Sequence, residues 1–208
     1  MRRELLLLAI ASGAACSTPS QSARTLPVGN TQITLNMGRT HSSADSADES
    51  EWHGELSVRR GLAERFDIAL KVARTPGLGE TLGAYTLDPK LMFTGPREHT
   101  AVSFGVPVGV LFDEAPDDTN AVAYFISPTV YVGHQASPTL ELTIAPRALI
   151  SFPDDEDHRV DFGGSIGTRF TDVGKYWAVH PELGFLRVTE NGQSTNVITV
   201  GLGISAEN

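Results

Sequence analysis

Carboxylates and histidines stand together at two places where they could do chemistry. The run from Asp154 to Asp157 is acidic throughout and is followed by His158, and carboxylate oxygens suit Ca²⁺. The run lacks the D-x-[DN]-x-[DN]-G spacing of a calcium loop, so we interpret it as a solvated acidic loop. His53 lies near Glu51 and Glu55 and is the nearest candidate for a catalytic histidine. We interpret it as a surface histidine.

Motifs of the common enzyme classes are missing from the sequence in the structural context that they need. It contains no H-E-x-x-H, no Walker loop, and neither G-x-S-x-G nor G-x-G-x-x-G on a strand–helix unit. Asp117, Asp118, Asp157 and His158 lie in predicted links without recognisable catalytic spacing. The one cysteine excludes an internal disulfide and any multi-cysteine metal site. We expect no catalytic residue, metal or cofactor. The alternative is that the protein is a hydrolase.

Composition narrows the class of protein. The 208 residues include 25 acidic and 16 basic ones, and the formal net charge is −9. This acidic balance argues against nucleic acid as a partner. Gly and Pro are frequent, which favours strands and turns over helices. No apolar run approaches the roughly 18 residues of a membrane-spanning helix.

The start of the chain is typical of an exported protein. Two arginines precede a leucine-rich segment and then small residues, so residues 1–15 are predicted to be a signal peptide. The Gly13-Ala14-Ala15-Cys16 stretch resembles a bacterial lipobox. That resemblance implies lipidation of Cys16 and handling by the lipoprotein-sorting machinery. Residues 16–30 are polar and are predicted to be a lipid-anchored linker. An ordinary secretory signal is the alternative.

From Thr31 onward, apolar and polar residues alternate, which puts each kind on its own face of a sheet. In residues 101–112, Val102 and Phe104 fall on one face and Ser103 and Gly105 on the other. The predicted strands are 31–38, 51–60, 65–74, 81–94, 100–112, 121–134, 139–152, 159–170, 175–188 and 196–206.

The links between these strands differ at the two ends of the sheet. Links after the odd-numbered strands, with their flanks, carry 14 acidic residues and two basic ones. Links after the even-numbered strands are mostly shorter and electrically balanced. Short turns at one end and longer loops at the other are typical of outer-membrane barrels. We therefore predict an all-β, up-and-down antiparallel transmembrane β-barrel of about ten strands over residues 31–208.

Alternation alone does not say which face is inside. In a membrane barrel the apolar face contacts lipid and the polar face lines the lumen; in a soluble periplasmic barrel the apolar face is the core. Glycines that share the polar face favour the first, because a narrow lumen needs small residues. The lumen charge network is then predicted to comprise Asp67, Lys71, Asp88, Lys90, Glu141, Arg147, Asp161, Arg169 and Glu182.

Three features resemble small Gram-negative outer-membrane barrels of the transporter-like kind. They are the stretch Arg24 to Gln32, the stretch Gly61 to Asp67, and a proline repeated near mid-strand. The resemblance implies the outer membrane and its lipid, with the barrel-insertion machinery as a partner. The chain departs from the usual pattern at its end, because Ile204 to Asn208 contains no aromatic residue.

Function follows from this architecture. Ten strands lie near the size at which side chains fill a barrel, so a wide porin is not expected. We predict a non-enzymatic outer-membrane barrel with termini in the periplasm and loops outside. It would serve narrow small-solute transport or a structural or surface role. The alternatives are a lipid-anchored soluble barrel that binds a small apolar ligand and the rim enzyme.

Overall fold

The computed structural model describes residues 21–44, 47–76, 81–115, 118–153, 158–171, 176–190 and 193–208. The predicted signal peptide and Cys16 lie outside these residues. Within them, no helix is long and apolar enough to cross a membrane.

The described chain is built from strands, in agreement with the predicted all-β class. Their bounds in chain order are β1 Thr31–Ala44, β2 Ala47–Ala63, β3 Phe66–Pro76, β4 Thr81–Met92, β5 Thr100–Gly105, β6 Val108–Ala115, β7 Asp118–Ile126, β8 Thr129–Ser137, β9 Leu140–Pro153, β10 Arg159–Phe170, β11 Trp177–Glu190 and β12 Gln193–Glu207.

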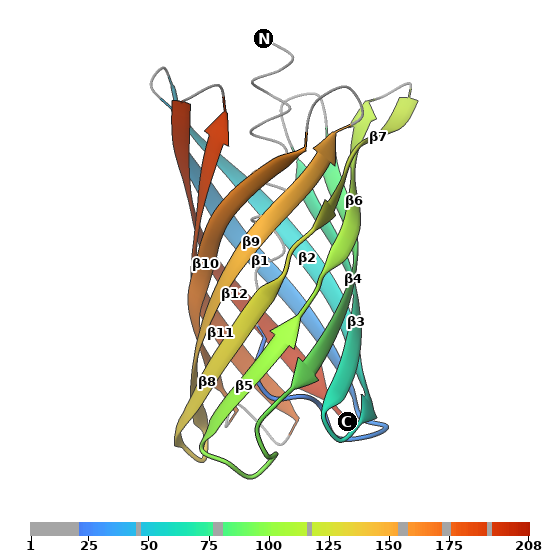
Figure 1. Cartoon of the computed structure of the whole chain (residues 1–208), viewed down its shortest axis with the longest axis vertical. Coiled ribbons are helices and arrows are strands. Elements are labelled where there is room, and N and C mark those ends of the chain that lie inside the picture. Colours follow the sequence, from blue (N-terminus) through green and yellow to red (C-terminus); the bar gives the residue numbers. More distant parts are fainter. Residues whose placement is uncertain are drawn as a thin grey trace.

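These strands form one antiparallel sheet that closes on itself (Figure 1). β1 pairs with both β2 and β12, and pairing of β9 with β10 completes the ring. β5 and β6 are two halves of one wall strand, as are β7 and β8, because each pair continues after a break of two residues. The barrel therefore has ten wall strands, as predicted. Closure leaves no unpaired edge, the condition that a sheet in lipid must meet.

Prolines cause the two breaks. Pro107 and Pro128 stand between the half-strands, and a proline has no N–H for the ladder. Their carbonyls still bridge the wall: Ser127 N donates to Pro107 O at 2.7 Å, and Ala148 N donates to Pro128 O at 3.1 Å. In the same way, Val106 N donates to Pro89 O at 3.2 Å. The predicted strands 100–112 and 121–134 are thus each interrupted without opening the barrel.

The two ends of the barrel can be told apart by their links. We call the end with the links after β1, β3, β6, β9 and β11 the loop end, and the other end the turn end. The start of β1 and the end of β12 meet at the turn end, where Gln32 pairs with Glu207. There Thr31 N donates to Asn208 Oδ1 at 2.9 Å. Figure 1 shows the C-terminus at this lower end.

Apolar side chains point outward and polar ones into the lumen. Ile144 and Val200 are 54% and 60% exposed, whereas Asp88 and Lys71 are 0% and 3% exposed. A soluble barrel would require the reverse arrangement, with its apolar set in the core. The facing is therefore that of a membrane barrel.

Aromatic residues lie on the outer wall near both ends, where membrane barrels carry interfacial girdles. Trp52, Tyr85 and Tyr124 are exposed near the loop end. Phe93 and Trp177 are exposed near the turn end. This distribution places the apolar band of the wall between two aromatic borders.

An arginine on the wall should cost more the nearer it lies to the middle of that band. Val200→Arg, in the middle of β12, should reduce the free energy of unfolding in lipid vesicles by about 2–4 kcal/mol. Ile33→Arg, near the turn end and 51% exposed, should cost about 0–1 kcal/mol. Urea titration of vesicle-inserted protein measures both, and equal costs at the two sites would contradict the facing.

Candidate functional site: the lumen

Four charged side chains meet at the centre of the lumen. Asp88 accepts from Arg59 Nη2 at 2.7 Å and from Lys71 Nζ at 2.9 Å. Asp67 pairs with the other arm of the same Arg59 guanidinium. Arg59, Asp67, Lys71 and Asp88 come from β2, β3 and β4, and each is at most 4% exposed. The network joins three neighbouring strands across their inner face.

A fifth charge extends the network. Lys90 Nζ lies 3.6 Å from Asp67 Oδ2 and 5.8 Å from the centre of the Tyr131 ring. Lys90 is 1% exposed. Burying five charges is tolerable only when each is paired and hydrogen-bonded, and the remaining bonds come from outside the wall.

Those bonds are supplied by residues 21–28, which run inside the lumen; we call them the lumen segment. Gln21 Nε2 donates to Asp88 Oδ2 at 2.8 Å. Lys90 Nζ donates to the carbonyl oxygens of Ser22 and Arg24 at 2.8 and 2.9 Å. Leu26 N donates to Asp67 Oδ2 at 3.0 Å. Part of the predicted linker is therefore bonded directly to the lumen charges.

Further contacts hold the lumen segment on its other sides. Ser22 Oγ donates to the Glu141 carboxylate on β9, at 2.7 Å to Oε2. The Arg24 guanidinium bonds Pro96 O at 3.0 Å and also Glu98 O, both in the link after β4. Ala23 is fully buried. The segment is thus fixed to opposite parts of the wall rather than to one strand.

Glycine makes room for the segment at Gly61. A Cβ there would overlap the carbonyl oxygens of Leu26 and Pro27. The backbones also pair, because Gly29 N donates to Gly61 O at 2.9 Å and Gly61 N donates to Asn30 O at 3.0 Å. No other residue type could stand at this close approach without shifting the segment.

The other predicted network residues lie above and below this centre. Asp161 accepts from Arg159 Nε at 2.7 Å and from Thr189 N at 3.1 Å. Arg169 pairs with Glu207 at 3.1 Å near the turn end. Glu182 is 6% exposed on the inner face of β11, and Arg147 is half-buried on the inner face of β9. The nine predicted charges therefore share one lumen, but only Asp67, Lys71, Asp88 and Lys90 belong to a common ion-pair network.

An apolar layer fills the lumen toward the loop end. Its side chains are each at most 6% exposed and come from seven strand segments around the wall. Gly109 and Gly163 admit the larger members, since a Cβ there would meet the Phe125 ring and Leu186. The layer consists of Ala73, Ala84, Leu111, Ala123, Phe125, Leu149, Leu186, Val188 and Val197.

Several features of the lumen were not predicted. Arg59 is absent from the predicted charge network; its alternation with Glu55 and Ser57 was the available signal. The apolar layer was missed because strands with apolar residues on both faces blur the two-residue period. The interpretation of His53 as a surface residue was wrong. It is 3% exposed and packs over Gly38, with Nδ1 3.3 Å from Thr40 Oγ1.

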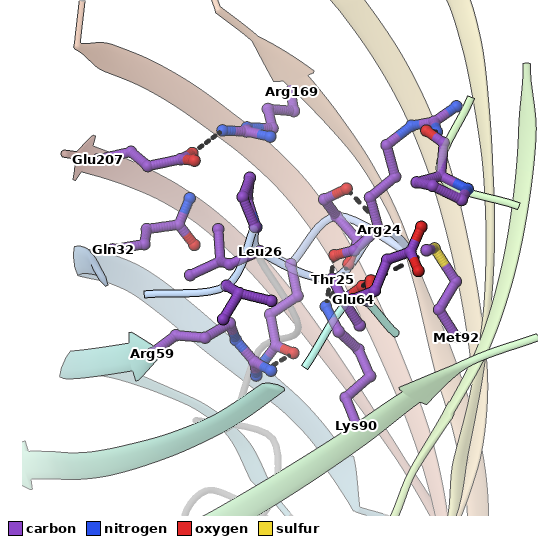
Figure 2. Close-up of a pocket in the computed structure, with 15 residues that line it drawn as sticks. Arg24, Thr25, Leu26, Gln32, Arg59, Glu64, Lys90, Met92, Arg169 and Glu207 are labelled. Atoms are coloured by element: carbon purple, nitrogen blue, oxygen red, sulfur yellow. Dashed lines mark hydrogen bonds and ion pairs between the residues drawn. The ribbon is translucent and has the colours of Figure 1, made fainter. Parts of the chain in front are cut away.

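A cavity of about 420 Å³ lies between the lumen segment and the wall near the turn end (Figure 2). Figure 2 shows Leu26 at its centre, the Arg169–Glu207 pair on one side, and Arg24 with Lys90 on the other. Cationic, anionic and apolar groups all line it. The described residues form no cluster of three or more metal-ligating side chains.

The closed wall, the outward apolar face and the charged lumen define a barrel of the outer-membrane type. No family model and no curated protein matches the sequence. The fold is similar to a COG4313 outer membrane channel from Pseudomonas putida F1, at 11% identity and a TM-score of 0.58, over 90% of this chain and 98% of that one.

Two further solved structures share the fold. One is a bacterial polysaccharide outer membrane secretin, with 9% identity, a TM-score of 0.53, and coverage of 86% of this chain and 98% of that one. The other is the translocator domain of the autotransporter NalP from Neisseria meningitidis, with 8% identity, a TM-score of 0.50, and coverage of 97% of both chains. At these identities the likeness concerns the fold alone.

Removing the central carboxylate should loosen the lumen segment. Asp88→Asn leaves Arg59 and Lys71 buried without their shared partner, which should cost about 3–5 kcal/mol of unfolding free energy. Trypsin should then cleave after Arg24, a bond protected in the unaltered protein. Mass spectrometry of the digest identifies the cut.

A paired variant provides the control. Asp88→Asn combined with Lys71→Met removes one charge of each sign and should recover part of the lost stability. An Asp88→Asn protein with unchanged unfolding and no new cleavage after Arg24 would contradict the assigned role of the network.

Proposed function

We propose that this protein is an outer-membrane passage for small solutes that is closed at rest by its own lumen segment. The observation that carries the proposal is the filling of the lumen. At its centre the space is occupied by residues 21–28 and not by wall side chains alone. Because the segment is held by hydrogen bonds and is not itself a strand of the wall, its departure would unfold no wall strand.

The membrane and the orientation are part of the proposal. The outward apolar band and its aromatic borders support insertion in a bilayer, and the fold is that of outer-membrane barrels. The acidic loop end would face the outside, and the turn end, with the start of β1 and the C-terminus, would face the periplasm. Lipid attached to Cys16 would lie on the same periplasmic side.

The wall exposed by departure of the segment would be polar and of mixed charge. Asp67 and Asp88 would remain beside Arg59, Lys71 and Lys90 on β2 to β4, with Glu141 on β9 opposite them. Charges of both signs favour small polar solutes over either ion type alone. Movement of solutes through such a passage requires no catalytic step.

The apolar layer sets a second barrier. Leu149, Leu186 and Phe125 pack together near the loop end, and an apolar constriction blocks ions and water until it widens or wets. The layer is also the observation that favours a second function, a permanently closed barrel with a structural or surface role. If the protein is a passage, removal of both the lumen segment and the apolar layer opens a path for solutes through the lumen. If the barrel is permanently closed, no path opens.

Conductance across planar bilayers separates these functions. The unaltered protein should be almost silent, because both barriers are in place. Deletion of residues 21–28 combined with Leu149→Gly and Leu186→Gly should give steady conductance. Each change alone should give less than the combination. A mobility shift on boiling shows that every variant is a folded barrel. A combined variant that folds and stays silent would overturn the proposed passage.

A single substitution at the contact between the lumen segment and the wall tests the same proposal without a deletion. Gly61→Val places side-chain atoms where the carbonyls of Leu26 and Pro27 lie, so it should displace the segment. In the Leu149→Gly, Leu186→Gly background it should raise conductance toward that of the deletion. Gly54→Ala is the matched control, since a Cβ there has its nearest neighbour at 3.9 Å. Equal conductance of the two variants would argue against displacement.

A further inference from the structure

The cavity between the lumen segment and the wall, which we call the turn-end cavity, can be reached from outside the barrel. Its volume of about 420 Å³ is typical of sites for small molecules. Pro27 and Val28 of the lumen segment line it and are exposed, so the cavity opens at the turn end. A small molecule can therefore enter it without displacing the segment.

Three of the four described cations that line the turn-end cavity are already engaged. Arg59 and Lys90 belong to the central charge network and are 3% and 1% exposed. The Arg24 guanidinium donates to three carbonyl oxygens of the link after β4. An anionic group of a ligand would therefore have Arg169 as its partner.

Arg169 and Glu207 form an ion pair in which both groups can take a second partner. Arg169 on β10 reaches Glu207 on β12 across β11, with Nη2 3.1 Å from Oε2. The two side chains are 18% and 26% exposed. Within the described residues, Arg169 Nε has no hydrogen-bond partner, and Glu207 Oε1 has a long contact, 3.5 Å from Asn30 Nδ2. A cation and an anion thus lie side by side on the cavity wall.

An amide and apolar side chains lie next to this pair. Gln32 is the register partner of Glu207 and is 7% exposed. Figure 2 shows its amide below the Arg169–Glu207 pair, without a bond to the other residues drawn. Leu26 lies at the centre of the cavity and Met92 on its far side (Figure 2). The cavity therefore offers two opposite charges together at one side and apolar surface beyond them.

From this arrangement we infer that the turn-end cavity binds a free α-amino acid with an apolar side chain of the size of leucine. An α-amino acid carries its carboxylate and its ammonium on one carbon, so its charges match a guanidinium and a carboxylate that lie 3.1 Å apart. Arg169 binds the carboxylate through its guanidinium, Glu207 accepts from the ammonium, and the side chain packs on Leu26. The inference goes beyond the proposed passage and concerns the closed barrel, so it stands whether or not the lumen conducts.

Ligand-observed NMR on the full chain in non-ionic detergent micelles tests the inference, with empty micelles as the blank. L-leucine should bind. Isocaproate, which lacks the ammonium, and isoamylamine, which lacks the carboxylate, should each bind about tenfold less tightly. The leucine isomer ε-aminocaproate carries its two charges far apart and should also bind less tightly. Tighter binding of ε-aminocaproate than of leucine, or no binding of leucine, would overturn the inference.

Substitutions in the ion pair should change the preference between these ligands in opposite directions. Arg169→Gln should weaken leucine binding about tenfold, while isoamylamine binds at least as tightly as before. Glu207→Gln should weaken leucine binding to a similar degree, while isocaproate binds at least as tightly as before. A purely structural defect would weaken the binding of all ligands together, and that result would contradict the roles assigned to Arg169 and Glu207.

Arg159→Gln is the matched control. Arg159 also lies on β10 and also forms an ion pair, with Asp161 at 2.7 Å, but near the loop end, so this variant should bind leucine as the unaltered protein does. Deletion of residues 21–28 removes Leu26 and should abolish leucine binding. The mobility shift on boiling shows that each variant is a folded barrel. Equal loss in the Arg159→Gln and Arg169→Gln variants, or leucine binding that survives the deletion, would overturn the inference.

Discussion

A sheet that closes on itself has two faces and no edge, and the rest of this structure depends on that constraint. In lipid, every backbone amide must find a partner within the wall, and each side chain must point either to lipid or to the lumen. The prolines at 107 and 128 show how strictly the first condition is met, since their carbonyls still accept bonds across the break. The second condition sends carboxylates such as Asp67, Asp88 and Asp161 inward, where they are almost fully buried.

Inward charges create a problem that the wall alone does not solve. Arg59 divides its two nitrogens between Asp67 and Asp88, yet Lys90 and the second oxygen of Asp67 still need hydrogen-bond partners. The backbone of the lumen segment supplies them, and Gln21 adds a bond to Asp88. The wall and the segment are therefore complementary, because the segment makes hydrogen bonds that the wall alone leaves open. The apolar layer solves the same problem differently, by filling the loop end with side chains that need no partners.

The fold was largely predictable from the sequence, and the site only in part. Period-two alternation located all ten wall strands, because lipid outside and charge inside make the contrast between faces large. Inward placement of Asp67, Lys71, Asp88 and Lys90 followed from the same pattern. The lumen segment could not be found this way, since residues 21–28 have no periodicity and their partners are distant in the chain. His53 was misjudged because a lone histidine beside glutamates gives no sign of which face it occupies.

The position of the lumen segment has a consequence for the order in which the parts of the molecule assemble. The segment precedes β1 in the chain, yet its partners lie on β2, β3, β4 and β9. None of those partners is in position until the wall has curved and closed. We therefore expect the first described part of the chain to reach its final place only after the wall has formed. In a closed barrel that still lacks the segment, water would have to take the place of the hydrogen bonds that residues 21–26 make to Asp67, Asp88 and Lys90.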